Sequence, residues 1–400
     1  MNKNKNHEPF SNLLVQHLRN LQPQVMKKIT LIAALLCFAA SFAQTSSKKV
    51  QVAILFDTSN SMDGLIDQAK SRIWKIVNEV GSLTYQGQTP TIEFALYHYG
   101  NDNLSSETNY IEKILDLTSD LDIISQKLFG LTTNGGQEYC GAVIGKSLQE
   151  LNWSSSPTDL KMIYIAGNEP FNQGPVDFRE ECKKAVGRGV FINTIYCGDY
   201  DQGVREFWQE GATCSQGDYF NINSNEAVVH IETPYDEKIQ TYNDSLNGTY
   251  YGYGGLGSAR KQEQSMQDSN AEMEAPAVAT ERAIVKSKAM YSNSSWDLID
   301  GVNSGAIDLD SAKEGELPEE FKGLSAEERN ALFKSKENDR KNFQNKINEL
   351  AVERQKFIDA EMKKRAEEGV VDDFGTSVNK SIQEKAEEIG YKKETPDIEE

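Results

Sequence analysis

Basic residues and histidine are scarce in this chain of 400 residues. Its 42 lysines and arginines are outnumbered by 61 aspartates and glutamates, it has only 4 histidines, and its formal net charge is -19. Nucleic acids and anionic membrane surfaces are bound by clusters of basic residues. The composition therefore excludes both as partners, and it favours partners that are cationic, neutral or bridged by a metal ion.

Long apolar runs and the usual catalytic motifs are also missing. The apolar run Ile29–Phe38 has about half the length that a membrane-spanning helix needs, so we expect no permanent membrane span in the mature chain. No Cys-x-x-Cys pair or histidine-rich spacing indicates a zinc site. The sequence contains no nucleophile elbow, triad spacing or metal-binding histidine pair, and this disfavours an enzyme.

Positively charged, apolar and small residues follow one another near the N-terminus. Met26 and two lysines precede the run Ile29–Phe38, and Ala43 ends a short segment that contains small residues. This order predicts a secretory signal peptide at residues 26–43, with residues 1–25 an extension that precedes the true start. We therefore expect an exported protein, either secreted or held in the periplasm or cell envelope of a Gram-negative-type bacterium.

Few cysteines remain after the predicted signal peptide: Cys140, Cys182, Cys197 and Cys214. An even number of cysteines in an exported chain allows two disulfides, which can pair in three ways. The alternative is that one or more of them, Cys197 above all, is a small buried hydrophobic residue. The sequence does not decide between these alternatives.

The stretch Lys49–Gly64 contains the strongest functional pattern. The nearly continuous apolar run Val50–Phe56 predicts a strand that is buried on both faces of a sheet, and residues 63–80 have the apolar periodicity of a helix. Between them lie one carboxylate and two hydroxyls, spaced two residues apart: Asp57, Ser59 and Ser61. Such hard oxygen donors suit Mg²⁺ or Mn²⁺.

This pattern resembles the D-x-S-x-S signature of the von Willebrand factor A (VWA) domain, in which it forms the metal-ion-dependent adhesion site (MIDAS). The resemblance covers residues 48–232. It implies an α/β fold with a Rossmann-like, mostly parallel sheet between two layers of helices. The alternative is that Asp57 caps the following helix and that the serines belong to a turn.

A glycine-rich loop at residues 132–138 takes the place of the second metal-binding loop of the family, in which a threonine binds the metal. Here Gln137 and Glu138 follow the double glycine, so either Thr133 or Glu138 is expected to supply the oxygen. Two alternatives remain open: this corner of the site is incomplete, or the loop is a flexible glycine turn.

The third loop follows the apolar run Leu160–Ala166, which predicts another buried strand. The family usually ends this strand with Asp-Gly, whereas this chain has Gly167-Asn168. Asn168 or Glu169 is expected to replace the missing aspartate, because both carry oxygen donors that suit a hard cation. The three loops should meet at the carboxyl ends of the strands, where α/β sheets bind their ligands.

Apolar runs and helical periodicities alternate through the rest of this region, as in an α/β sheet. The predicted strands lie at residues 90–99, 110–117, 190–196 and 218–222, and the predicted helices at 120–131, 139–151, 176–187 and 203–211.

Composition changes after residue 232. Residues 233–295 are predicted to be a linker with one edge helix at 234–246. Within it, residues 258–290 are polar and rich in Gln, Glu, Ala and Ser, which predicts either a linker or a loose helix. The glycine spacing within Tyr250–Gly257 resembles a dinucleotide-binding loop, but no apolar strand precedes it, so we interpret it as part of the linker.

Residues 296–390 are predicted to be a helical region. It begins with a small ordered segment at 296–310, and a capping box at Ser325 and Glu328 opens a long charged helix to about residue 368. That helix is interpreted either as an arm on the domain or as a coiled coil with another chain. Residues 391–400 are predicted to be a disordered acidic tail.

Together these features predict a non-catalytic, exported protein-protein interaction module. In the VWA family the partner often completes the metal coordination with an acidic side chain, and a bound cation attracts a carboxylate even to an acidic protein. Two alternatives are a structural envelope module with a degenerate metal site and, less favoured, a metal-assisted hydrolase that uses Glu138 and Glu169 as acid and base.

Overall fold

A computed structural model describes residues 48–222, 231–367 and 374–393 of the chain. The predicted N-terminal extension and signal peptide lie outside the described residues. Residues from Lys48 onward form one compact unit. Within the described ranges no helix is long and apolar enough to cross a membrane.

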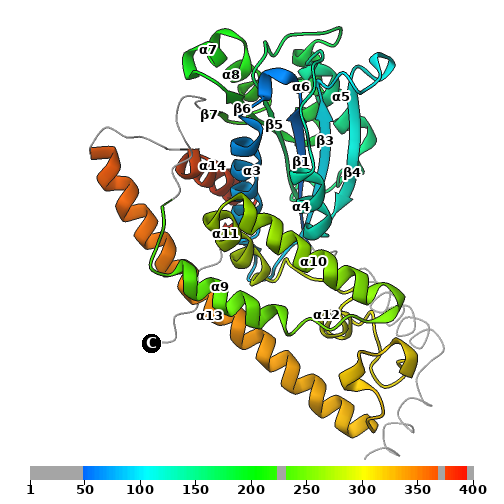
Figure 1. Cartoon of the computed structure of the whole chain (residues 1–400). Helices are drawn as coiled ribbons and strands as arrows, with labels where there is room; N and C mark the ends of the chain where they lie inside the picture. The colour runs from blue at the N-terminus through cyan, green and yellow to red at the C-terminus, as the bar shows by residue number, and fades with distance from the viewer. Residues whose placement is uncertain (1–47, 223–230, 368–373, 394–400) are drawn as a thin grey trace, which may run out of the picture. The chain divides into compact units, whose positions relative to one another are not determined.

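A six-stranded sheet forms the centre of this unit, with strand order β4-β3-β1-β5-β6-β7 (Figure 1). All neighbouring strands are parallel except β3 and β4, which are antiparallel. The strands are β1 (Lys49–Asp57), β3 (Thr91–Tyr99), β4 (Ile111–Thr118), β5 (Leu160–Gly167), β6 (Phe191–Cys197) and β7 (Tyr219–Ile222).

The central strand β1 is buried on both faces, as its apolar run predicts. Val52 and Ile54 point into one hydrophobic core and Ala53 and Leu55 into the other. The first core is closed by α3 (Ile66–Val80) and α4 (Leu121–Phe129), and the second by α5 (Cys140–Glu150) and α6 (Phe178–Arg188). A mostly parallel sheet between two helix layers is the fold that the sequence predicts, and this prediction is confirmed.

The register of β1 determines where the candidate site lies. Asp57 at its carboxyl end is level with Tyr99 of β3, and Phe56 is level with Ala166 of β5. The loops that leave these three strands therefore begin at the same edge of the sheet.

The helix predicted at 203–211 is wrong in detail, because two short helices occupy this part of the chain. They are α7 (Tyr200–Arg205) and α8 (Trp208–Thr213). Phe207 lies between them with φ of +69°, a left-handed conformation that a continuous helix does not contain.

Two helices, separated by Ala275, occupy residues 254–286, so of the two alternatives for residues 258–290 the helix is correct and the linker is wrong. After α9 (Asp236–Asn247) the chain forms α10 (Gly254–Glu274) and α11 (Pro276–Lys286). Ile239 and Leu246 of α9 and Ala283 of α11 belong to the same hydrophobic core as the sheet.

The inner side of α10 is largely polar, so this helix has little apolar periodicity in its sequence. Gln264 and Gln267 are buried there. Arg282 of α11 is also buried and forms ion pairs with Asp122 of α4 at 2.6 Å and with Asp268 of α10 at 2.7 Å. Lys286 forms a second ion pair with Asp268. Burial raises the pKa of Asp268, but Lys286 and Arg282 outweigh this effect and lower it to about 2. Hydrogen bonds and ion pairs thus hold α10 where apolar contacts would be expected.

A third, smaller core surrounds α12 (Leu298–Asn303), within the segment 296–310 that the sequence predicts to be ordered. Its buried residues include Tyr251, Leu298 and Phe321. The long helix α13 (Ala326–Glu367) follows, and Ser325 and Glu328 form the predicted capping box, with each backbone N–H bonded to the other side chain.

Helix α13 packs along α9 of the same chain, which favours the arm over the coiled coil with another chain. Ile347 is fully buried in the main core. Arg354 of the same helix is buried as well and forms ion pairs with Asp236 and Glu281 at 2.8 and 2.5 Å.

The C-terminal elements return to the sheet domain. Helix α14 (Phe374–Glu388) packs on α3, and β8 (Tyr391–Lys393) pairs antiparallel with β2 (Leu83–Tyr85). The predicted disordered tail is therefore wrong for residues 391–393, and the remainder of that tail, 394–400, lies outside the described residues.

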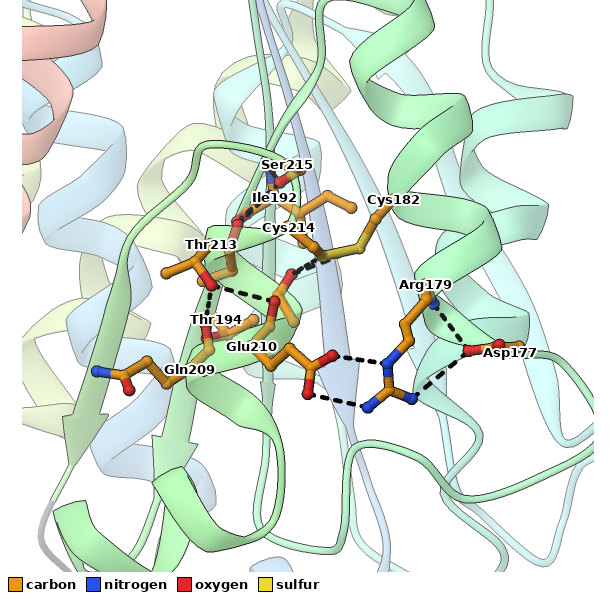
Figure 2. The surroundings of a disulfide bond; sticks show 12 residues. Asp177, Arg179, Cys182, Ile192, Thr194, Gln209, Glu210, Thr213, Cys214 and Ser215 are labelled. Carbon is orange, nitrogen blue, oxygen red and sulfur yellow. Dashed lines mark hydrogen bonds and ion pairs between the residues drawn. A yellow bond between two sulfur atoms is a disulfide. The ribbon is translucent and has the colours of Figure 1, made fainter.

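One disulfide forms among the four cysteines. Cys182 of α6 is bonded to Cys214, the residue that follows α8, whereas Cys140 and Cys197 are buried thiols (Figure 2). The bidentate ion pair between Arg179 and Glu210, at 2.6 and 2.9 Å, ties the same two helices together. The alternative of buried, unpaired cysteines is thus correct for two of the four.

Candidate functional site

Asp57 ends β1 at the centre of the edge where the three loops meet. Its side chain is fully buried, and its Oδ1 atom accepts a hydrogen bond from the backbone N–H of Ser59 at 2.8 Å. Its Oδ2 atom is buried and has no hydrogen-bond partner. A buried carboxylate oxygen without a partner is costly, so this atom is positioned for a ligand.

The surroundings of Asp57 disfavour its ionised form. Burial raises the pKa of this carboxyl from 3.8 to about 8, the N–H of Ser59 opposes the shift, and the nearby carboxylates of Glu138 and Glu169 add to it. Burial also raises the pKa of Glu138, again with a contribution from Glu169. Acidic groups from all three loops therefore repel one another across this edge.

The two serines of the first loop differ in exposure. Ser59 is buried and Ser61 is exposed, and their hydroxyl oxygens lie 2.8 Å apart. The hydroxyl of Ser61 donates to Oδ1 of Asn168 at 2.9 Å, and the amide of Asn168 donates to the carbonyl oxygen of Ser61 at 3.0 Å. Asn168 thus connects the first loop to the third.

The second loop places its two candidate residues differently. The hydroxyl of Thr133 donates to Asp63, which follows the first loop. Glu138 is buried near Asp57 and Ser59, and its charge helps to raise the pKa of Asp57. The structure therefore brings Glu138 to Asp57 and pairs Thr133 elsewhere.

The third loop is held in place by hydrogen bonds to α8 and to the residue that ends α7. The indole N–H of Trp208 donates to the carbonyl oxygen of Glu169 at 2.8 Å, and the backbone N–H of Phe171 donates to the carbonyl oxygen of Glu206 at 2.9 Å. The rings of Phe171 and Trp208 pack edge to face, with their centroids 4.9 Å apart. This leaves the carboxylate of Glu169 facing the site, with Gln173 donating to it at 3.4 Å.

Two glycines leave room around the carboxyl group of Asp57. A Cβ atom on Gly100, which has φ of +76°, would lie 2.8 Å from Oδ1 of Asp57 and 3.0 Å from Cγ of Glu138. A Cβ atom on Gly167 would lie 3.1 Å from Oδ2 of Asp57 and 2.7 Å from the hydroxyl of Tyr99. Aspartate at position 167, as the family usually has, would fill the space beside the unpartnered oxygen.

A cleft of about 580 Å³ opens beside these loops. None of the residues that line it carries a positive charge. They are Asn60, Ser61, Gly135, Gly136, Gln137, Glu138, Tyr139, Glu169, Gln173 and Gly174.

The sequence did not indicate the residues that the loop after β3 contributes. Asp102 adds to the negative potential at Glu138, and its backbone N–H donates to the carbonyl oxygen of Gly135. Gly100 also belongs to this loop, and its backbone lies close to Oδ1 of Asp57. The sequence of this loop contains no recognisable metal-binding motif. Only its position, directly after a strand that neighbours β1, could have indicated that it reaches the site.

The donors at this edge fit a hard divalent cation. They are oxygens only: the unpartnered carboxylate oxygen of Asp57, two serine hydroxyls, Glu138 and the side chains of the third loop. Within the described residues, no group of three or more histidine, cysteine or acidic side chains is arranged to hold a metal. A cation here would therefore depend on hydroxyls and water as well as carboxylates.

No family model and no curated protein matches this chain. Among solved structures it is similar to the SpRpn10 VWA domain, with 14% identity and a TM-score of 0.35 over 45% of this chain and 90% of that one. BatB from Bacteroides thetaiotaomicron has 17% identity and a TM-score of 0.33 over 55% of this chain and 99% of that one.

A third similar structure is proximal thread matrix protein 1 from the mussel byssus with a zinc-occupied MIDAS motif, at 16% identity and a TM-score of 0.35. That match covers 45% of this chain and 43% of the mussel protein, so this chain spans less than half the length of that protein. At these scores the comparisons add no argument about the site. What the structure itself shows is a mostly parallel sheet between two helix layers, with the Asp57–Ser61 loop at the end of the central strand.

Proposed function

We propose that this protein is a non-catalytic binding module that takes Mg²⁺ or Mn²⁺ at the carboxyl edge of its sheet and binds a protein partner there. The observation that carries the proposal is the unpartnered, fully buried Oδ2 atom of Asp57. Acidic side chains from two other loops, Glu138 and Glu169, face the same place and raise the pKa of Asp57. A divalent cation would neutralise this repulsion and give the orphaned oxygen a partner.

In this proposal Asp57, Ser59 and Ser61 supply the first loop's oxygens, and Glu138 takes the role that a threonine has in the family. Thr133 is the weaker candidate because its hydroxyl is already bonded to Asp63. Asn168 positions Ser61, and Glu169 contributes charge from the third loop. A bound cation would offer its remaining coordination positions to water or to a ligand.

The chemistry of the cleft indicates the kind of partner. Its lining is polar or acidic, without lysine or arginine, so an acidic side chain has no protein cation to meet there. A cation at Asp57 would supply the missing positive charge. We therefore expect a partner that inserts a carboxylate beside the amide side chains of Asn60, Gln137 and Gln173.

Export to an oxidising compartment also belongs to this proposal. The disulfide between Cys182 and Cys214 is of a kind that persists in the periplasm or outside the cell. We propose the periplasm or cell envelope as the place where the module binds its partner.

The test is thermal unfolding of the purified protein in EDTA, in Mg²⁺ and in Mn²⁺. A ligand that binds only the folded state adds about 2.7 kcal/mol at one hundred times its dissociation constant, which is visible as a rise in the midpoint. We expect this rise in the wild type and its loss in Asp57→Ala.

Two variants identify the donor from the second loop. Glu138→Gln should reduce the metal-induced rise, whereas Thr133→Val should leave it close to that of the wild type. If neither metal moves the wild-type midpoint at millimolar concentration, the metal-dependent function is wrong. The protein is then better explained as a structural module with a degenerate site.

A further inference from the structure

The outward side of α10 carries an uncharged seam that no described part of the chain covers. Its exposed residues recur at alternating spacings of four and three, the spacing of a coiled-coil contact. They are Gly255, Ala259, Gln262, Met266, Ser269 and Met273. We call these six residues the α10 seam.

Apolar exposure is concentrated on this helix. Leu256, Met266 and Met273 are 69%, 54% and 78% exposed, so α10 holds three of the seven large exposed hydrophobic side chains of the described residues. The opposite side of α10 is fixed by buried Gln264 and Gln267, so rotation of the helix cannot bury these residues. Exposed apolar groups gathered on one element indicate a contact surface.

Charge is absent along most of the seam. Between Gly255 and Ser269 the exposed side chains of α10 are all neutral, in a protein with 26% charged residues and a net charge of -19. Two copies of so acidic a chain repel each other over most of their surfaces, and a neutral seam is where they can approach. It also lacks the charges that would select an acidic or a basic partner.

The sizes of the seam side chains and the charges at the ends of α10 favour an antiparallel arrangement of two such helices. With Gln262 opposite Met266, the larger Met273 lies opposite Gly255, and Ala259 lies opposite Ser269. Met273 thus meets a residue without a side chain, and the small residues Ala259 and Ser269 meet each other, which allows the helices to approach closely at these two positions.

The exposed acids Glu272 and Glu274 stand at the C-terminal turn of α10, and the half-buried Arg260 and Lys261 stand near its beginning. Antiparallel pairing places these acids at the positive N-terminal end of the other helix, whereas parallel pairing would place acid against acid.

A hollow beside the seam offers space for the partner's side chains. Its volume is about 500 Å³, and its lining consists of Gly252, Ser258, Lys261, Gln262 and Ser265. Because Gln262 belongs to both the hollow and the seam, a methionine that faces Gln262 from the other copy lies at the edge of this space.

We propose that the α10 seam is a homodimer interface in which α10 of one copy packs antiparallel on α10 of a second copy. The seam is about 27 Å long at 1.5 Å per residue. A single helix of this length covers less than the roughly 800 Å² per partner of a standard interface, so the dimer should be weak and form at high protein concentration.

Sedimentation equilibrium of the purified protein tests this proposal over a wide concentration range. The apparent mass of the wild type should rise toward twice that of one chain, and the double variant Met266→Lys/Met273→Lys should dimerise at least tenfold more weakly. Both methionines are exposed, so circular dichroism should show an unchanged fold. Val186→Lys, at a 46% exposed apolar residue on α6, is the matched control and should behave as the wild type.

Cysteine cross-linking tests the orientation. The cysteines of the described residues are buried or disulfide-bonded, so an introduced thiol on α10 is the accessible one. Ala259→Cys and Ser269→Cys should cross-link when the two variants are mixed, and each variant alone should not. A wild type that stays a single chain at every concentration overturns the proposal, as does a dimer that the lysine substitutions leave unchanged.

Discussion

At the scale of single residues, the carboxyl group of Asp57 is held where its ionised form is unfavourable. Burial raises its pKa to about 8, and Glu138 and Glu169 add repulsion. In the unfolded chain the same group has its ordinary pKa of 3.8. The folded protein therefore retains a proton that the unfolded chain has already lost at neutral pH.

This difference predicts how the stability of the metal-free protein depends on pH. Because the folded pKa lies above the unfolded one, the contribution of Asp57 is fully present below pH 4 and is lost as pH rises toward about 8. Urea unfolding in EDTA at several pH values should show a free energy of unfolding that decreases over this window.

The control for this prediction is Asp57→Asn, whose side chain cannot ionise. The free energy of unfolding of this variant should decrease less as pH rises. Saturating Mg²⁺ or Mn²⁺ should flatten the wild-type profile as well, because a cation stabilises the ionised carboxylate. Equal pH profiles for the wild type and Asp57→Asn in EDTA would contradict the assigned environment of this residue.

Of the site residues, the sequence could predict those that belong to a spaced pattern at the end of an apolar run. Asp57, Ser59 and Ser61 lie where that pattern places them. Whether Thr133 or Glu138 faces Asp57 depends on how the second loop turns, and one hydrogen bond to Asp63 decides this for Thr133. Such a contact has no signature in the sequence. Which of these side chains bind a metal stays a prediction.

At the scale of elements, α8 is held by two kinds of cross-link to α6. The disulfide between Cys182 and Cys214 closes a segment with a sequence separation of 32, and Arg179 pairs with Glu210 nearby (Figure 2). Trp208 of α8 in turn bonds the third loop of the site. Changes at this cross-link should therefore affect both stability and the site.

Removing the disulfide with Cys182→Ser/Cys214→Ser should lower the free energy of unfolding by about 2–4 kcal/mol, because the unfolded chain gains freedom. Urea unfolding measures this loss. Cys140→Ser serves as a comparison at a buried, unpaired thiol.

Thiol labelling of the unfolded mature chain checks the pairing directly. Two thiols should label without reductant and four after reduction. Four labelled thiols without reductant would rule out the disulfide.

The contact between α12 and α13 depends on a buried arginine. Arg340 of α13 pairs with fully buried Asp297 at 2.6 Å and with Asp300 at 2.7 Å, and it lies over the ring of Tyr250 at 4.2 Å. Its two aspartate partners would remain buried without a cation if it were replaced.

Arg340→Met should therefore lower the free energy of unfolding by about 3–5 kcal/mol. Arg365→Met, which removes a partly exposed pair with Glu361 on the same helix, should change it by less than about 1 kcal/mol. Chemical denaturation of both variants makes the comparison. Similar losses in the two variants would show that the buried pair is not the cause.

The elements that the sequence predicted best are those whose apolar residues face the sheet. β1 and β5 are continuous apolar runs, and α3 has a clear apolar stripe. α10 was not predicted as a firm helix because its inner side is built from Gln264, Gln267 and Asp268. Gln264 donates to the hydroxyl of Tyr291 and Gln267 accepts a hydrogen bond from Ser125. Asp268 forms ion pairs with Arg282 and Lys286. A polar helix interior gives no periodic signal, so only the folded structure reveals it.

At the scale of the whole molecule, one hydrophobic core joins the two ends of the described chain. Phe374, Val378 and Ile382 of α14 belong to the same core as β1 and α3. Gln383 donates to Glu79, and the hydroxyl of Tyr391 donates to the carbonyl oxygen of Lys49. The C-terminal residues are thus part of the sheet domain and not an appendage.

Deletion of residues 374–400 should accordingly destabilise the sheet domain by about 5 kcal/mol or more, because each large apolar side chain contributes about 1.5–3 kcal/mol when buried. A chain that lacks only residues 394–400 is the control and should melt as the wild type does. Calorimetry measures both, and equal melting temperatures would show that α14 and β8 are dispensable.

The sequence could predict the order of strands and helices in the sheet domain but not this closure. β2 and β8 have three residues each, too few for a recognisable alternation, and they pair across about three hundred residues. The capping box and charged composition of α13 predicted its helix. Its contact with α9 includes the ring contact of Phe343 with Tyr242 and the ion pair of Arg354 with Asp236, and the sequence does not show which segment these residues meet.

The late position of β8 has a consequence for biosynthesis. A ribosome releases the N-terminal strands long before residues 391–393, so the central strand is complete while the partner of Lys49 and of β2 is still to be made. Contacts between such distant segments form slowly and only after synthesis of the whole chain. A chain whose sheet domain closes only with its last described strand completes its folding after translation, as the proposed export through a translocation channel would require.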